Sequence, residues 1–525
     1  MTSVSDGTRT WTYSYDTLGN LTTVRQPDGS LWQLGGAAAL LNKFQYLLDP
    51  DCDTSGNLEL LPLTGSLTHP SGAVGTFTLV PTMHGRSQVN RVCRGGPITP
   101  TYATFPKFFA THSLTSKTIT GPGLPSLTWT HAYGAPNASW SPCSGCAETK
   151  TVSVTNPQGW VTRYTFGNRY LVNEGKLLIQ DDGFGTSSTR STSTSYRSFG
   201  SIGSTGQSRG DSGLNSTLMA VEQKAVTQQG VNFTWQASSF DGFARPNLVT
   251  RSSGLGYSRA DTTAYFDQRT KWVLGQVASV TESSTGLTSE SYAYDAATAN
   301  RLASYSFGLL QESYSYNADG TLFARYDPLS RATVYTNYKR GLAQNVSYPN
   351  STAESAVVNN LGLITAHTNP AGTTSGYGYD AMGRLASITP PGGDAVAYFP
   401  TTLLFEQVAS AELGLAAGHW RQTVATGNAR TMRYFDGLWR ERLSYTYDLA
   451  NPTATGKALE TRYDADGRKL FTSYAQRNLS AIDSALNGTA SAFDALGREF
   501  GRYQDSELGV LTTSTAYLSG CQESA

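Results

Sequence analysis

Charged residues are scarce in this chain of 525 residues. They make up 15% of it, and 39 Lys and Arg balance 39 Asp and Glu. An average soluble domain carries about 25%. Nucleic acids and anionic membrane surfaces are held by clustered positive charge, and a chain of zero net charge has no general field for either. We therefore expect no nucleic-acid partner.

Long apolar runs are also lacking, and cysteines are few. No segment approaches the ~20 apolar residues of a membrane helix, so we expect no membrane span. Residues 1–10 have no basic start and no apolar stretch, which excludes a classical secretory signal there. Five cysteines are too few for a disulfide scaffold of this size, and the odd number leaves at least one unpaired within the chain.

Residues that favour strands and turns are abundant instead. The chain has 53 Gly, 21 Pro and 29 Tyr, together with many Ser and Thr. Aromatic residues and threonine favour strands, whereas glycine, proline and serine favour turns. The composition indicates an all-β protein.

One short pattern recurs along the chain: Tyr-Asp, two variable residues, Gly, a polar residue and often an aliphatic one. One copy has Asn in place of Asp, and another has Phe in place of Tyr. The residues that we predict to shape these turns are Tyr15, Asp16, Gly19, Tyr316, Asn317, Gly320, Tyr379, Asp380, Gly383, Arg384, Tyr463, Asp464, Gly467, Arg468, Phe493, Asp494, Gly497 and Arg498. Looser copies begin at Phe240, Tyr294, Tyr326 and Tyr447.

The pattern has a period, and a second kind of turn lies between its copies. Equivalent positions at Asp295, Asn317, Lys339, Asn360 and Asp380 are separated by 22, 22, 21 and 20 residues. Between them come turns of the type Asn-Pro-x-Gly, such as residues 369–372. An Asp accepts hydrogen bonds from the backbone two residues on, Gly takes the positive φ, and Pro presets its own φ. Turns every ~10 residues leave strands of ordinary length, ~5–6 residues.

Aromatic residues often precede the Asp with one residue between them, as in Tyr377-Gly378-Tyr379 and Tyr445-Thr446-Tyr447. A period of two places both rings on one face of a strand. We expect successive repeats to stack these rings into ladders that serve mainly as packing. Such a ribbon of hairpins buries each unit only against its neighbours.

These residues resemble the YD-repeat proteins of the bacterial rearrangement-hotspot (RHS) group, which includes wall-associated repeat proteins and the animal teneurins. Clear copies cover residues 290–390 and 430–505, with isolated ones at 13–30, 156–170 and 240–250. The resemblance implies a spiralling antiparallel β-sheet of YD-repeat hairpins that forms a shell or part of one. In bacterial members the shell typically encloses a C-terminal toxin until its delivery.

The resemblance also implies a junction, Asp-Pro-x-Gly-Leu, that closes the shell and is cut by aspartates. Asp327-Pro328 is followed here by Leu329-Ser330, and repeats continue beyond it, which favours one more repeat turn. Residues 519–525 contain no such junction. We therefore expect any toxin or effector partner to lie outside this chain.

No sharp boundary divides the chain. We predict an N-terminal β-rich region with sparse repeats at 1–155, degenerate repeats at 156–285 with an insertion rich in Ser, Thr and Gly at 185–217, and a YD-repeat region at 286–525. Helical spacing of leucines predicts a helix from Ala37 to Leu48, ended by Asp49-Pro50. A second helix is predicted from Glu406 to His419.

Catalytic and metal motifs are weak. Cys143 and Cys146 form a lone CxxC without a second pair, which leaves metal binding, a disulfide and unpaired thiols open. Cys52, Cys93 and Cys521 are scattered, and nothing in the sequence alone pairs them. The six histidines, at 69, 84, 112, 131, 367 and 419, show no HxxxH, HxH or HExxH spacing, and neither GxSxG nor a phosphate-binding loop occurs. We predict no cofactor, no metal and no enzymatic activity, although two carboxylates brought together by folding stay open.

The interpretation that these features favour is a structural shell segment. It would enclose or present a toxin or effector polypeptide in bacterial competition or host interaction, as a secreted or cell-surface protein without a recognisable signal peptide. The alternative is a cell-surface adhesin or carbohydrate-binding repeat module with a cell-surface glycan as partner, because ring faces also stack on sugars.

Overall fold

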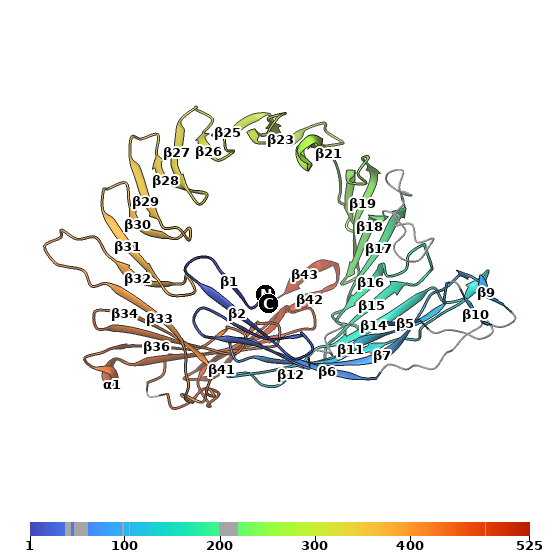
Figure 1. Ribbon diagram of the computed structural model, residues 1–525, viewed down its shortest axis with the longest axis horizontal. Helices are drawn as coiled ribbons and strands as arrows, with labels where there is room; N and C mark the ends of the chain where they lie inside the picture. The colour runs from blue at the N-terminus through green and yellow to red at the C-terminus, as the bar shows by residue number, and fades with distance from the viewer. Residues whose placement is uncertain are drawn as a thin grey trace. The chain divides into compact units, whose positions relative to one another are not determined.

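The computed structural model describes residues 1–36, 44–46, 61–96, 99–103, 105–198, 219–477 and 479–524 (Figure 1). Nearly all of its regular structure is β-strand; the helical elements are α1 (Pro452–Thr455) and the short 3-10 turns η2 (Arg269–Lys271) and η3 (Ser519–Cys521). Among these residues the strand ladders are antiparallel, apart from the short parallel pair of β8 (Val89–Asn90) and β13 (Trp140–Ser141). The predicted all-β fold of antiparallel hairpins is confirmed.

The chain forms two compact units. The first contains Met1–Asn232, Phe405–Gln422 and Arg430–Ala525, and the second contains Phe233–Leu404 and Thr423–Ala429. Four strands include the boundaries: β19 (Val231–Phe240), β33 (Thr401–Gln407), β34 (Trp420–Thr426) and β35 (Ala429–Phe435). The boundaries predicted from the sequence at residues 155 and 285 were drawn from how densely the repeats occur and not from contacts between residues. They stay predictions.

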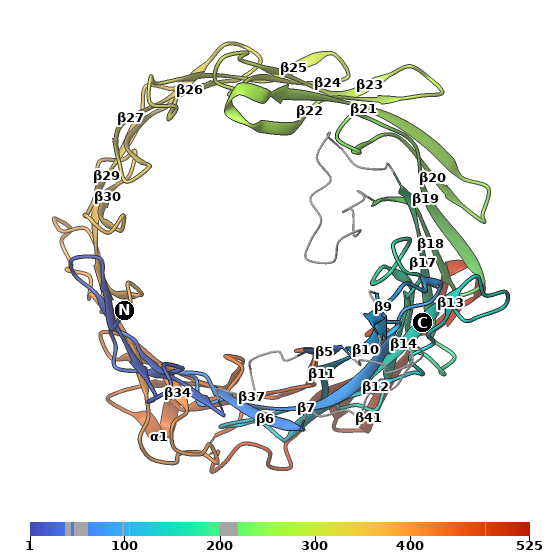
Figure 2. The same cartoon turned by 45° about the vertical axis from the view of Figure 1, so that its right-hand side comes forward.

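The second unit is a meander in which each strand pairs with the next one in sequence. Figure 2 shows these hairpins following one another from green to orange. The spacing of about 20 residues read from the sequence corresponds to one hairpin with its two turns. The strands are β20 (Pro246–Ser253), β21 (Ser258–Gln268), β22 (Val273–Glu282), β23 (Thr288–Tyr294), β24 (Arg301–Ser306), β25 (Leu309–Tyr316), β26 (Leu322–Tyr326), β27 (Ala332–Lys339), β28 (Leu342–Ser347), β29 (Ala353–Val358), β30 (Ile364–Thr368), β31 (Thr374–Tyr379) and β32 (Leu385–Thr389).

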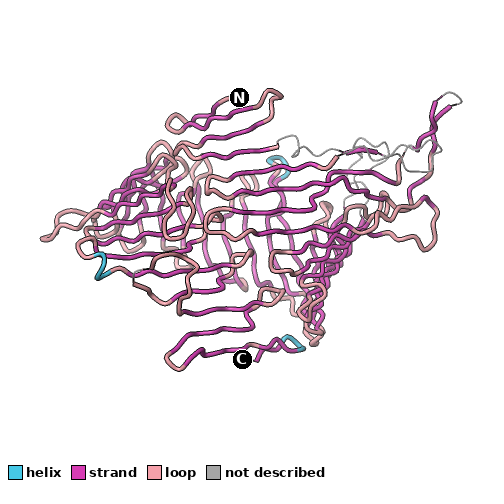
Figure 3. The backbone as a smooth tube through the Cα atoms, turned by 90° about the horizontal axis from the view of Figure 1, so that it is seen from below, coloured by secondary structure: helices cyan, strands magenta, loops and turns pink. Residues whose placement is uncertain are grey.

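The first unit contains two runs of strands, one in the N-terminal part of the chain and one in the C-terminal part; Figure 3 traces the backbone between the two labelled ends, mostly as strand. The first run, in pairing order, is β1 (Ser3–Ser5), β2 (Thr10–Tyr15), β3 (Leu21–Arg25), β4 (Leu31–Gly35), β6 (Leu63–Thr68), β7 (Val74–Gly85), β11 (Phe108–Thr120), β12 (Leu127–Tyr133), β14 (Thr149–Thr155), β15 (Val161–Gly167), β16 (Leu177–Asp182), β17 (Arg190–Ser198) and β18 (Met219–Gln228). Two longer strands dominate this run, since β7 and β11 pair from Val74↔Thr120 to Gly85↔Phe108.

The second run of the first unit contains the C-terminal repeats. It comprises β35 (Ala429–Phe435), β36 (Glu441–Asp448), β37 (Lys457–Tyr463), β38 (Lys469–Ser473), β39 (Gly488–Phe493), β40 (Glu499–Ser506) and β41 (Gly509–Ser514). Smaller pairs are β9 (Cys93–Gly96) with β10 (Thr99–Ala103), and β42 (Ala516–Leu518) with β43 (Gln522–Ser524).

A cluster of buried hydrophobic residues lies in the first unit. Leu415, Tyr434, Leu443, Ala458 and Ile482 form one cluster, each at most 7% exposed. Elsewhere most strand residues are neither buried nor fully exposed; every residue of β22 is in this intermediate range. A strand that covers a core alternates between buried and exposed side chains. In such regions the sheet is therefore a single layer, with no second layer packed against either face.

The predicted helix at 406–419 was wrong. The segment continues β33 to Gln407 and then turns, with left-handed backbone at Leu413 (φ 52°), Gly414 (φ 81°) and Gly418 (φ 91°). Left-handed residues end a right-handed helix, and the turns place Leu415 in the core, where it is fully buried. Tertiary packing overrides the helical spacing of this segment.

Two other predictions fall partly outside the described residues. Within the predicted helix at 37–48, Phe44–Tyr46 form strand β5 against β11, which contradicts a helix there; the rest of that segment lies outside. Within the insertion at 185–217, strand β17 pairs with both β16 and β18, and residues 199–217 lie outside.

Candidate functional site

The Tyr-Asp turns share one network of hydrogen bonds, which Asp380 illustrates. One carboxylate oxygen accepts from the backbone N–H groups of Met382 (2.8 Å) and Arg384 (2.9 Å), and the other accepts from Arg384 Nε (2.6 Å). The backbone closes the turn, because Gly383 N–H donates to the Asp380 carbonyl at 2.9 Å. One aspartate therefore satisfies three donors around the turn.

The other predicted turn residues lie in the same kind of turn. Asp464 and Asp494 hold Arg468 and Arg498, whereas Asp16 accepts from Asn20 instead of Arg. In the copy with Asn317, Asp319 accepts from Thr321 N–H at 3.0 Å and takes over part of the network. The glycines at 19, 320, 383, 467 and 497 all have φ between 77° and 86°.

Two of the looser copies, at Asp241 and Asp327, and a further turn at Asp436 keep the turn without glycine. Ala244, Ser330 and Trp439 have φ of 57°, 62° and 62° at the position of the glycine. Each belongs to a turn in which Arg four residues after Asp donates to it. The Asp327 turn is one of these, so Asp327-Pro328 forms a further repeat turn. The Asp and Arg spacing in the sequence identifies such copies better than the glycine does.

The motif tyrosines have a role that the sequence did not reveal. Several lie at or near the end of a strand, and their hydroxyls donate to a carbonyl of the preceding strand or just before it: Tyr379 to Ile364 (2.6 Å) and Tyr316 to Arg301 (2.8 Å). The same contact joins Tyr15 to Met1, Tyr294 to Val277, Tyr338 to Leu322 and Tyr463 to Glu441. A stacked ring pair between different strands occurs at Phe266 and Tyr294, at 5.1 Å between ring centres, but the hydroxyl bond recurs more regularly.

Replacing Tyr379 with Phe is expected to lower the free energy of unfolding of the second unit by about 0.5–1.5 kcal/mol, because one hydrogen bond is lost. Tyr377→Phe is the matched control, since the Tyr377 hydroxyl, on the same strand, has no partner among the described residues. Urea unfolding followed by circular dichroism measures both. Equal effects would contradict a structural role for the Tyr379 hydroxyl.

Turns from the N-terminal half pack against the C-terminal repeats of the first unit, and we call this contact the seam (residues 69–73, 121–124, 415–420 and 436–442). Trp420 Nε1 donates to the Pro70 carbonyl at 2.8 Å, and Ser71 Oγ donates to the Gly437 carbonyl at 2.5 Å. Gly437 N–H donates to the Pro122 carbonyl at 2.9 Å. Segments more than 300 residues apart in sequence are thereby joined.

Charged side chains are buried beside the seam. Glu460, whose side chain is 0% exposed, accepts from Arg462 Nε at 2.8 Å and from the Asp483 N–H at 2.9 Å. Arg442 donates to Asp483 at 2.7 Å and to the carbonyls of Gly123 and Thr461. Each charge has an opposite partner and hydrogen bonds, so the cluster holds the seam together rather than offering a free reactive group.

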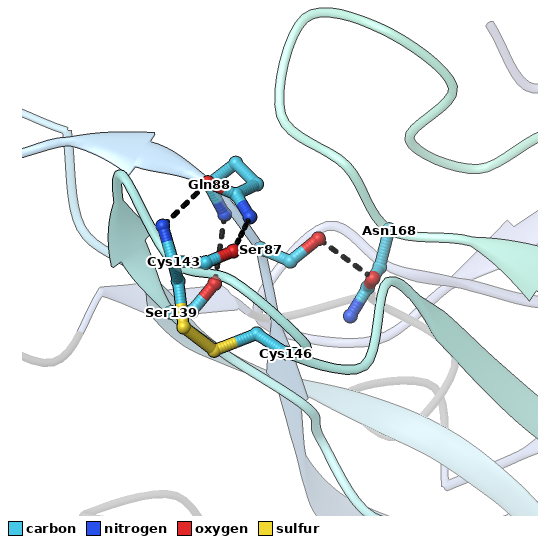
Figure 4. Close-up of a disulfide and its surroundings, with 6 residues drawn as sticks. All are labelled: Ser87, Gln88, Ser139, Cys143, Cys146 and Asn168. Atoms are coloured by element: carbon cyan, nitrogen blue, oxygen red, sulfur yellow. Dashed lines mark hydrogen bonds between the residues drawn. A yellow bond between two sulfur atoms is a disulfide. The ribbon is translucent and has the colours of Figure 1, made fainter.

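The two cysteines of the CxxC motif form a disulfide, which is one of the alternatives that the spacing left open (Figure 4). Gln88 holds their loop, because its amide donates to the Cys143 carbonyl (2.5 Å) and accepts from the Cys143 N–H (3.1 Å). Gln88 N–H donates to Ser139 Oγ, and neighbouring Ser87 Oγ donates to Asn168. The disulfide thus closes a loop that is tied to β8. Cys52 lies outside the described residues.

The histidines are dispersed. In the part of the chain that the structure describes, no group of three His, Cys, Asp or Glu side chains lies close enough to hold a metal ion. His367 lies 3.3 Å from Glu354, and buried His419 accompanies Glu412 at 3.9 Å. In the same described ranges, no helix is both long and apolar enough to cross a bilayer.

His84 is the centre of a half-buried polar chain. Its Nδ1 lies 3.1 Å from Lys150 Nζ, and its Nε2 lies 3.1 Å from Ser113 Oγ. Lys150 also donates to the Met83 carbonyl at 2.7 Å. Burial, and then the Lys150 charge, lowers the pKa of His84 to about 4, and burial lowers the pKa of Lys150 to about 8. At neutral pH we expect neutral His84 to accept a hydrogen bond from the Lys150 ammonium.

We expect the first unit to lose stability as the pH falls from about 6.5 to about 4. The pKa of His84 is lower in the folded state than the ordinary 6.5, so the unfolded chain binds more protons in this window and stability rises with pH. The full gap corresponds to about 3 kcal/mol, and partial exposure of the ring reduces the expectation to about 1–2 kcal/mol. Urea unfolding at pH 7 and pH 4.5 measures this loss. His84→Gln should show a smaller loss, and an unchanged one would refute the assignment to His84.

The profile of the RHS repeat family matches residues 1–31 and 359–395. A comparison with characterised proteins found no match. Among solved structures, the crystal structure of TcdB2-TccC3-TEV is similar with a TM-score of 0.36 and 10% identity over 97% of this chain and 27% of that chain. The Photorhabdus luminescens Tc holotoxin pore gives 0.34 and 11% over 97% of this chain and 26% of that chain. This chain thus spans about a quarter of the length of those it matches.

Proposed function

Because the chain is a YD-repeat protein of the RHS group, we propose that it is a structural wall segment that encloses or presents a toxin or effector polypeptide. The polypeptide acts in bacterial competition or host interaction, and the wall acts at the cell surface or outside the cell. The wall isolates its partner and has no catalytic role of its own.

The observation that carries this proposal is the thinness of the sheet. In β22 and β30 every residue is partly exposed, so neither face is covered by a second layer. A globular enzyme buries one face of its sheet to form a core and a pocket. A wall that is a single layer of sheet instead leaves both faces available, one for a partner and one for solvent.

The seam also supports containment. A containing wall has to resist separation of its strands, and a meander held only by neighbouring strands can open locally. The seam ties turns at residues 69–73 and 121–124 to the C-terminal repeats by direct hydrogen bonds. Local opening of the first unit then requires loss of these contacts too.

Purification of the full chain from its native host tests the proposal. We expect a co-purifying polypeptide that resists trypsin until the chain is unfolded by urea, and mass spectrometry identifies it. Sequencing the locus on both sides should find further repeats and a small distinct domain. A chain that carries no polypeptide, from a locus that encodes none, would contradict containment.

The adhesin alternative makes a different prediction. Binding of intact cells by the purified chain, without any co-purifying polypeptide, would favour adhesion over containment.

A further inference from the structure

A groove of about 310 Å³ lies within the first unit, apart from the seam. One side is the face of β12, β14, β15, β16 and β17, and the other is formed by the YD turns at 464–468 and 494–498. The two sides approach closely, because a Cβ on Gly183 would lie 3.0 Å from the Cβ of Ala495. The repeats thus supply one side of a site whose other side is the N-terminal sheet.

Strand register places the groove's polar and aromatic residues on one face. Val154 is opposite Thr162, Thr162 is opposite Asp182, and Asp182 is opposite Arg190. Tyr164 is two residues beyond Thr162 and shares its face. A row of different side chains therefore lines the groove across four neighbouring strands.

Three aromatic residues line it: Trp129, Trp160 and Tyr164. Lys117 Nζ lies 3.9 Å from the Trp129 ring centre, and the Arg468 guanidinium lies 5.5 Å from that of Trp160. These cations hold the rings in place. Among the described residues, the two indole N–H groups and the Tyr164 hydroxyl have no hydrogen-bond partner.

Tyr164 differs in this respect from the motif tyrosines, whose hydroxyls donate to carbonyls. Burial, together with the Asp182 charge, raises the pKa of Tyr164 above its ordinary value. Its hydroxyl stays protonated and can donate to a ligand in the groove. Three donors on aromatic rings are thus available in one place.

The charges of the groove are already paired. Asp182 accepts from Arg190 at 2.8 Å and from Gln180 at 2.8 Å, and Arg468 donates to Asp464 and to Asp466 at 2.7 Å. A phosphate or sulfate ligand needs unpaired positive charge, and a cationic ligand would compete with Lys117 and Arg468 for the rings. The site favours a neutral ligand with hydroxyl groups.

We propose that this groove binds a neutral pyranose unit of a glycan. Aromatic faces pack against the C–H surface of a sugar ring, while Asp182, Arg190 and Asn156 bond its hydroxyls. Its volume is at the lower end of the ~300–1,000 Å³ of ligand pockets, which suits one or two rings. The inference goes beyond containment and does not depend on it.

An array of neutral, sialylated and sulfated glycans, probed with the purified full chain, tests the proposal. We expect selective binding to neutral glycans, and titration with the best of them should change tryptophan fluorescence. Binding to none, or to sulfated or sialylated glycans only, would overturn the proposal. Containment is measured separately by the trypsin-resistant polypeptide, so the two ideas fail independently.

Variants locate the binding. Tyr164→Phe removes only the hydroxyl and should weaken binding about 2- to 10-fold, and Trp129→Ala should weaken it at least about 10-fold. Trp272→Ala is the control, because Trp272 is 73% exposed in the other unit and should leave affinity unchanged. Circular dichroism verifies that each variant folds. Equal affinity in Tyr164→Phe, Trp129→Ala and the parent would overturn the assignment to this groove.

Discussion

Replacing Trp420 with alanine is expected to lower the free energy of unfolding of the first unit by about 3–5 kcal/mol. Trp420 is 4% exposed and packs against Phe405 at 4.8 Å and Trp439 at 5.3 Å between ring centres. Its indole N–H bonds the Pro70 carbonyl across the seam. Alanine leaves a cavity among these rings and an unpaired carbonyl, so both losses add.

Trp420→Phe separates the two losses. It keeps most of the ring packing and removes the N–H donor, and we expect a loss of about 1–3 kcal/mol from the unpaired carbonyl. Urea unfolding measures both variants. It is followed by far-ultraviolet circular dichroism, which reports the backbone and does not rely on tryptophan fluorescence. An alanine variant with the stability of the parent would mean that the seam contributes nothing to the first unit.

Replacing Asp436 with alanine is expected to cost about 3–5 kcal/mol, because it leaves Arg440 as a mostly buried charge without its partner. The Asp436 side chain is 0% exposed and that of Arg440 is 14% exposed. Asp436 accepts from the N–H groups of Leu438 (2.9 Å) and Arg440 (3.0 Å) and from Arg440 Nε (2.8 Å). All of these donors lose their acceptor at once.

Asp16→Ala is the matched control in the same unit. Asp16 accepts from the N–H groups of Leu18 and Asn20 in the same turn geometry, but it is exposed and its side-chain partner is the neutral Asn20. We expect a much smaller loss than for Asp436→Ala, because water replaces the lost contacts. Urea unfolding compares the two, and similar losses would show that burial of the turn is unimportant.

The turns and their spacing were determined by local sequence. Tyr-Asp-x-x-Gly-Arg specifies a turn by hydrogen bonds within five residues, so its effect does not depend on the rest of the chain. That is why the hairpins, their period and the all-β class could be predicted. It is also why Ser330 and Trp439 can take the place of glycine, since Asp327 and Asp436 with their arginines still hold the turn.

Local sequence also misled where contacts at a distance decide. Helical spacing at 406–419 was overridden because Leu415 is buried against residues that follow it in the chain, such as Leu443 and Ile482. The motif tyrosines were predicted to stack, and the bonds from the hydroxyls of Tyr379 and its equivalents to carbonyls of the preceding strand were not predicted. Period-two spacing places a ring on a face, but only strand register determines what its hydroxyl meets.

The seam, the disulfide and the aromatic groove were decided by the tertiary structure alone. Trp420 and Pro70 are 350 positions apart, and the groove combines Trp129 and Tyr164 with Arg468. Such contacts depend on how many strands separate two turns and on which run of strands lies beside which. Neither the number of strands nor the arrangement of the runs is encoded in a single repeat, because every repeat specifies the same turn. Partners across the first unit are chosen by packing of the whole chain.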